Sequence, residues 1–110
     1  MRISVCHCTE CQRRTGSVFG VQARFPASAV TIDGPSAGWT RTADSGNTIE
    51  FHFCPNCGST VYYLPHAEPD LVAVAVGAFA DAAFPAPRVS VYESRRHPWV
   101  TVPDGVEHFD

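Results

Sequence analysis

Five cysteines are the residues of this sequence best suited to chemistry, and they fall into two groups. Cys6, Cys8 and Cys11 form the first group, and Cys54 and Cys57 form the second. Each group contains two cysteines separated by two residues, the local spacing with which thiolates hold a zinc ion about 2.3 Å from each sulfur. The spacing therefore predicts that all five cysteines are zinc ligands.

The spacing leaves two arrangements of these ligands open. One ion can take Cys8, Cys11, Cys54 and Cys57 in a closed site, with Cys6 as a spare thiol. Alternatively, the first group alone holds an ion through three thiolates and leaves a fourth position open, as in catalytic zinc sites. A thiol redox pair at Cys54 and Cys57 is a weaker interpretation, because the βαβ pattern of thioredoxin-like proteins is missing.

His7 lies between two of these cysteines in the sequence. Imidazole is a common metal ligand. His7 is therefore either a further ligand or a residue that faces away from the ion and supports the ligands from outside.

The elements that must position these residues are short. The chain has 110 residues, 45% of them hydrophobic, which predicts one globular domain over residues 1–110. Nine prolines and eight glycines divide it into short runs, which favour strands and turns over long helices. We expect a mainly β protein.

Apolar and polar residues alternate along Val18–Phe25 and Thr48–Phe53, which predicts two strands. Leu71–Val76 is apolar on both faces and predicts a central, buried strand. Four ranges bounded by turn residues are further strand candidates: 30–32, 60–64, 71–77 and 88–92. The third of them contains the buried strand. Helical turns are expected only in 9–17 and 78–84.

Two segments are predicted to be irregular. Gly34–Asn47 is rich in turn residues and reads as a surface loop or hairpin, with Trp39 in its middle. In the C-terminal tail, we expect Tyr92, Trp99 and Phe109 to anchor the chain against the sheet.

The charge of the chain argues against several classes of partner. The net charge is −3, and all eight basic residues are arginine, so a broad basic face for nucleic acid is not expected. No apolar run approaches the roughly 18 residues of a membrane span, and the first residues lack the apolar core of a signal peptide. We expect a cytoplasmic protein without nucleic-acid or membrane partners, whose cysteines stay reduced.

Three segments resemble the glutathione-dependent formaldehyde-activating enzyme family: Cys6–Phe19, Phe53–Ser59 and Tyr92–Val100. The resemblance implies a β-tent fold of short antiparallel sheets organised around zinc-binding cysteine knuckles. It implies that the first cysteine group holds the zinc ion near the chemistry. The second group matches half of a separate structural zinc site, and the other half, an early Cys-x-Cys strand, has no counterpart before Cys6.

The resemblance also implies a function. We expect a zinc-dependent carbon–sulfur lyase-type enzyme that handles a glutathione–aldehyde adduct, by forming S-hydroxymethylglutathione or by a related thiol reaction. Its small-molecule partners would be a thiol such as glutathione and an aldehyde. The alternative is a catalytically silent, zinc-stabilised binding module that kept the fold.

The residues that follow the first cysteine group are candidates for substrate binding. Glutathione carries two carboxylates, and the planar guanidinium groups of Arg13 and Arg14 suit such groups. Gln12 and Thr15 can add hydrogen bonds at the same place. No catalytic residue apart from the metal ligands is predicted.

Overall fold

The computed structural model describes residues 1–110 and has a single eight-stranded sheet with the strand order β3-β4-β5-β6-β2-β1-β7-β8. The strands are β1 (Arg2–Cys6), β2 (Gly20–Pro26), β3 (Ala37–Thr42), β4 (Thr48–Phe53), β5 (Thr60–Pro65), β6 (Leu71–Ala75), β7 (Val89–Val91) and β8 (Glu107–His108). One α-helix, α1 (Thr9–Thr15), is accompanied by the 3₁₀ turns η1 (Ala27–Ala29), η2 (Val76–Phe79) and η3 (Glu93–Arg95). The predicted mainly β fold is confirmed.

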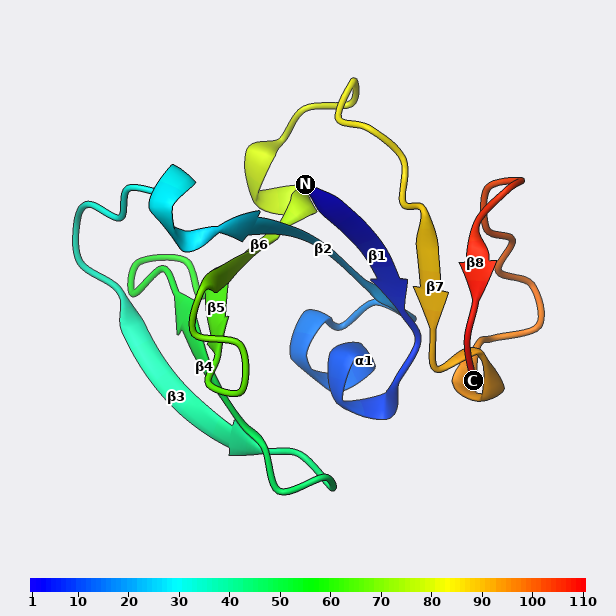
Figure 1. Cartoon of the computed structure of the whole chain (residues 1–110), viewed down its shortest axis with the longest axis horizontal. Coiled ribbons are helices and arrows are strands. Elements are labelled where there is room, and N and C mark those ends of the chain that lie inside the picture. Colours follow the sequence, from blue (N-terminus) through cyan, green and yellow to red (C-terminus); the bar gives the residue numbers. More distant parts are fainter.

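The sheet curves around α1, which lies between the β3–β5 side and the β1–β7 side (Figure 1). Neighbouring strands from β3 to β1 are antiparallel, whereas β7 runs parallel to both β1 and β8. Because α1 directly follows β1, the chain passes from the sheet into the space that the curved sheet surrounds. The first cysteine group spans the end of β1, the connection and the first turn of α1.

The middle of the sheet contains the most buried apolar residues. In β6, Val72 and Ala73 are adjacent and both buried, so both faces of this strand are covered. Ala73 packs in one cluster with Phe51 and Tyr63, from β4 and β5. The predicted central, buried strand is confirmed, although it ends at Ala75 and continues as η2.

One predicted strand is wrong, and of the two interpretations of the segment 34–47, a loop or a hairpin, the structure agrees with the hairpin. The predicted strand at 30–32 is irregular chain after η1. The segment 34–47 contains β3 and the turn of a β3–β4 hairpin, in which Trp39 stacks on Phe51 of β4 at a ring-centroid distance of 4.8 Å. Cross-strand pairing of this kind stabilises a strand that lies in a segment rich in turn residues.

The helical predictions are confirmed in part. The predicted turn at 9–17 is α1, but in the range 78–84 only the end of η2 is helical. The longest helix, α1, has seven residues. No helix in the chain is long and apolar enough to cross a membrane.

The C-terminal tail is held differently from the prediction. Tyr92, Trp99 and Phe109 are exposed, with Trp99 71% exposed, so the expected aromatic anchoring is wrong. The smaller side chains of Val100 and Val106 are buried instead. The backbone also pairs β8 with β7 in parallel, which fixes the end of the chain to the sheet.

Candidate metal centre

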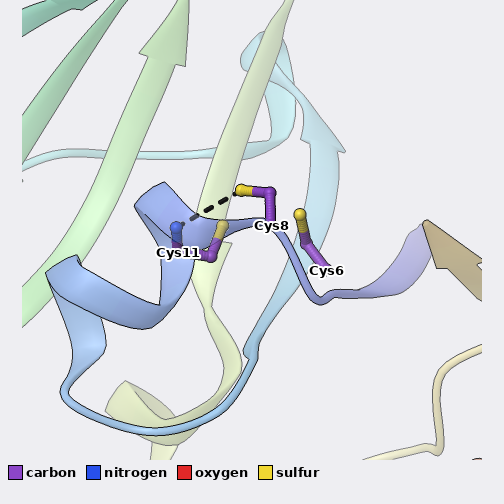
Figure 2. A group of neighbouring side chains, drawn as sticks. All are labelled: Cys6, Cys8 and Cys11. Carbon is purple, nitrogen blue, oxygen red and sulfur yellow. Dashed lines mark hydrogen bonds between the residues drawn. The ribbon is translucent and has the colours of Figure 1, made fainter. Parts of the chain in front are cut away.

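The thiols of Cys6, Cys8 and Cys11 meet at the start of α1. Their Sγ atoms all lie within 4.8 Å of one another. Figure 2 shows the three sulfurs turned towards a common point, from the end of β1, from the connecting residue and from the first turn of α1. The structure thus brings together the first cysteine group, as one of the two predicted arrangements requires.

Local geometry explains this convergence. Cys8 is extended (φ −62°, ψ 154°) and caps α1, because its Sγ accepts a hydrogen bond of 3.3 Å from the Cys11 backbone N–H. Residues three apart lie on the same side of a helical turn, so this cap also brings the two sulfurs together. Cys6 adds its thiol from the last position of β1.

The three thiols have very different proton affinities. Hydrogen bonds from Cys11 and Cys6 lower the pKa of the Cys8 thiol far below its usual 9.0. Hydrogen bonding to Cys11 and Cys8, together with burial, raises the pKa of the Cys6 thiol. Without a cation, the cluster therefore favours one thiolate that two neutral thiols stabilise.

The cluster fits a thiophilic divalent ion. Three sulfurs bound tetrahedrally at 2.3 Å are about 3.8 Å apart, so only a small contraction of the cluster is needed. A divalent charge favours the ionised form of the thiols that the cluster otherwise keeps protonated. Cys6, Cys8 and Cys11 can therefore hold a metal ion and leave a fourth position for another ligand.

His7 faces away from the sulfurs. Its side chain is completely buried, and its Nε2 lies 3.0 Å from the Ser90 Oγ in β7. Burial lowers the pKa of His7, which favours the neutral imidazole. Of the two predicted roles, the structure agrees with a residue that supports the ligands from outside.

Arg14 places a positive charge beside the cluster. Its Nη2 lies 4.0 Å from the Cys11 Sγ. Its guanidinium carbon is 5.2 Å from the ring centroid of Phe51 and 5.4 Å from that of Tyr63. The two rings hold the cation against the inner face of the sheet by cation–π attraction.

A cavity of about 540 Å³ opens next to this arginine. Its wall combines the end of α1, the start of β2, the turn between β4 and β5, and the end of β6 with η2. Arg14 and Gly20 both line the cavity and both adjoin Cys11, so the cavity lies beside the cysteine cluster. Its volume is in the range of sites for small organic ligands.

The four predicted substrate-binding residues do not lie in one place, and only two of them line the cavity. Arg14 and Thr15 line the cavity. Arg13 is exposed and pairs with Glu10 at 2.7 Å. That these residues bind substrate stays a prediction. Arg14 and Thr15 are better placed for it than Arg13, because they line the cavity.

The side chain of Gln12 contacts the C-terminal segment. Its Nε2 donates to the His7 carbonyl oxygen at 2.9 Å, and its Oε1 lies 3.1 Å from the His97 Nε2. Gln12 therefore connects α1 to the C-terminal segment. Its predicted role in substrate binding is not tested by this contact and stays a prediction.

Cys54 and Cys57 lie apart from the cluster. They belong to the turn between β4 and β5, where Cys54 is partly buried and Cys57 is exposed. No His, Cys, Asp or Glu forms a three-ligand group with them. Their assignment as metal ligands stays a prediction, and Cys57 faces the cavity.

The sequence interpretation missed residues that shape this site. Phe51 and Tyr63 carry the guanidinium of Arg14, and Gly20 leaves room for it. The alternation in Thr48–Phe53 indicated that Phe51 faces one side of the strand, but it did not indicate which helix residue would meet that side.

Fold and site together define a mainly β protein with a three-cysteine candidate metal centre beside a small-molecule cavity. A family model described as glutathione-dependent formaldehyde-activating enzyme matches residues 1–95. The chain belongs to this family, and the resemblance in the sequence is confirmed. A comparison with curated proteins found no match.

Proposed function

We propose that this protein is a zinc enzyme that adds the thiol of glutathione, or of a related small thiol, to formaldehyde. The observation that carries the proposal is the meeting of three thiols, from Cys6, Cys8 and Cys11, beside a cavity large enough for a small organic ligand. Family membership supports the same thiol and aldehyde. In the proposed reaction the thiol sulfur bonds to the carbonyl carbon, the C=O π bond breaks, and the oxygen gains the proton that the thiol loses.

The chain supplies the binding of the reactants. A zinc ion held by the three cysteines supplies Lewis acidity that favours the thiolate form of a thiol. Arg14 adds a cation at the cavity wall, where a carboxylate of glutathione can form a charge-assisted hydrogen bond. Because the reaction joins two molecules, holding them in one cavity is expected to supply much of the rate enhancement.

The buried surroundings of the cysteines favour a rigid site. His7 is anchored to Ser90, and Arg14 is anchored to two aromatic rings, so the residues on both sides of the cluster are fixed before a ligand arrives. A site that is already ordered loses less entropy when it binds its reactants.

The test is the rate at which zinc-loaded protein forms S-hydroxymethylglutathione from glutathione and formaldehyde. We expect a rate above the uncatalysed one, abolished in Cys8→Ser and kept in Ser45→Ala, a change in the exposed β3–β4 turn. A zinc-loaded protein that gives no excess rate with several thiols and aldehydes would overturn the proposal. It would favour the alternative of a zinc-stabilised binding module.

A further inference from the structure

The outer face of β4 has a group of polar side chains that the proposed function does not use. Phe51 points to the inner face of the sheet, where it contacts Arg14. Successive side chains of a strand point to opposite faces, so Glu50 and His52 lie on the outer face. Neither residue lines the cavity beside Arg14 or belongs to the cysteine cluster. What this face binds is therefore a question separate from the proposed reaction.

Two imidazoles meet the carboxylate of Glu50. The His52 Nε2 lies 2.5 Å from its Oε2, and the His66 Nε2 lies 3.6 Å from its Oε1. His66 belongs to the turn that follows β5, and its backbone N–H donates to the Thr48 carbonyl oxygen at 3.0 Å. One carboxylate thus brings together imidazoles from two segments of the chain.

The other nitrogen of each ring contacts a hydroxyl group. The His52 Nδ1 lies 2.8 Å from the Ser36 Oγ, and the His66 Nδ1 lies 2.7 Å from the Thr48 Oγ1. A hydroxyl can accept a hydrogen bond from Nδ1–H, and that tautomer leaves the Nε2 lone pair free for a metal ion. Histidines that bind metal ions usually have such a partner on the second nitrogen. Both rings therefore have the surroundings of metal ligands.

One of the three side chains is fixed, and the other two are accessible. The His52 ring stacks on Tyr62 at a centroid distance of 4.5 Å and an interplanar angle of 6°. The side chains of Glu50 and His66 are 35% and 45% exposed, so an ion can reach them from solvent. The three groups do not all lie within 4.8 Å of one another, as the cysteine sulfurs do. An ion has to draw the two exposed side chains towards His52, which costs rotamer entropy.

We propose that His52, His66 and Glu50 form an outer-face metal site, which binds a divalent transition-metal ion and leaves coordination positions open to water. Two imidazoles and one carboxylate suit zinc, cobalt, nickel or iron(II), whereas calcium and magnesium prefer oxygen ligands alone. The ion joins β4 to the turn after β5. Because two of the ligands must first be ordered, we expect weaker binding than at the three thiols, and we expect gel filtration to remove this ion.

Titration of the zinc-loaded full chain with cobalt(II) tests this proposal. Zinc already occupies the thiolates, which select it. We expect about one equivalent of cobalt to bind, without the sulfur-to-cobalt charge-transfer absorption that a thiolate ligand gives. Paramagnetic cobalt should also broaden the NMR signals of the His52 and His66 rings, but not those of His108, which lies in β8 at the other edge of the sheet.

Three variants separate a built site from scattered surface histidines. Thr48→Val removes only the hydroxyl beside His66 and should weaken cobalt binding on the order of tenfold, whereas His66→Gln removes a ligand and should weaken it on the order of a hundredfold. His108→Gln is the matched control, because His108 contacts a single carboxylate, that of Glu93, and it should change nothing. Circular dichroism confirms that each variant is folded.

Several outcomes would overturn the proposal. One is that cobalt does not bind to the zinc-loaded protein, and another is that His66→Gln and His108→Gln weaken binding equally. A third is sulfur-to-cobalt absorption that Cys54→Ser abolishes, because the ion is then held by the β4–β5 turn. The cysteine cluster holds zinc in every measurement, so none of these outcomes bears on the rate of S-hydroxymethylglutathione formation.

Discussion

The Nη2 atom of Arg14 lies 4.0 Å from the Sγ atom of Cys11, so the only cation on the cavity wall adjoins the cysteine cluster. A positive charge at this distance stabilises negative charge on the thiolates. The same side chain forms part of the cavity wall, and it is held by the rings of Phe51 and Tyr63. Arg14 therefore links the candidate metal centre to the place where a ligand would bind.

We predict that Arg14 stabilises the fold more than Arg13 does. Arg14→Gln removes the cation from two aromatic rings and should cost about 1–2 kcal/mol in the free energy of unfolding. Arg13→Gln removes only an exposed pair with Glu10 and should cost less than about 0.5 kcal/mol. Urea unfolding of both variants measures the difference, and equal losses would contradict this account of Arg14.

Zinc content should distinguish the two cysteine groups. We expect Cys8→Ser to lose the bound zinc and Cys54→Ser to retain about one equivalent, because only Cys8 belongs to the cluster of three thiols. Metal analysis after gel filtration is the measurement. If both variants lose the metal, the ion is held by one closed site that includes Cys54.

Gly20→Ala should disturb the contact between Arg14 and Cys11. A Cβ at Gly20 would lie 3.1 Å from the Arg14 Nη2 and 3.5 Å from the Cys11 Cβ. We expect a loss of about 1–3 kcal/mol in unfolding free energy and weaker zinc binding. Gly77→Ala is the matched control, because its Cβ would meet nothing within 4 Å. Comparable losses in both variants would show that the space at Gly20 is not important.

The contact between Glu93 and His108 should make stability depend on pH. The hydrogen bond from His108, and then that from Ser90, lowers the pKa of Glu93 below its usual 4.5. The unfolded chain therefore binds this proton at a higher pH than the folded chain, so the stabilisation is present above about pH 4.5 and is lost as the pH falls through the lowered pKa.

Glu93→Gln tests that dependence. We expect the variant to be less stable than the original protein by about 1 kcal/mol near pH 6, with the difference shrinking as the pH falls below about 4.5. Denaturant unfolding across this range is the measurement, with Glu10→Gln as the control for an exposed carboxylate. A difference that does not change with pH would contradict the assignment.

The strands that the sequence predicted correctly are those with a local signal. Thr48–Phe53 alternates and Leu71–Ala75 is apolar on both faces, and both are strands in the structure. β1 (Arg2–Cys6) was not predicted, and β3 (Ala37–Thr42) was expected only as one arm of a possible hairpin. Each is stabilised by pairing with a neighbouring strand, and such pairing is not visible in the residues of one segment.

The sequence by itself indicated that Cys6, Cys8 and Cys11 can meet, because they lie within six residues and one helical turn suffices to bring them together, but it left open a closed site that also included Cys54 and Cys57. Only the tertiary structure decided that Cys54 and Cys57 lie apart from them, since that separation depends on how the β4–β5 turn is placed relative to α1. It also decided that Arg14, and not Arg13, faces the cavity. The local spacing of residues fixes contacts within a turn, whereas contacts between segments depend on the curvature and strand order of the whole sheet.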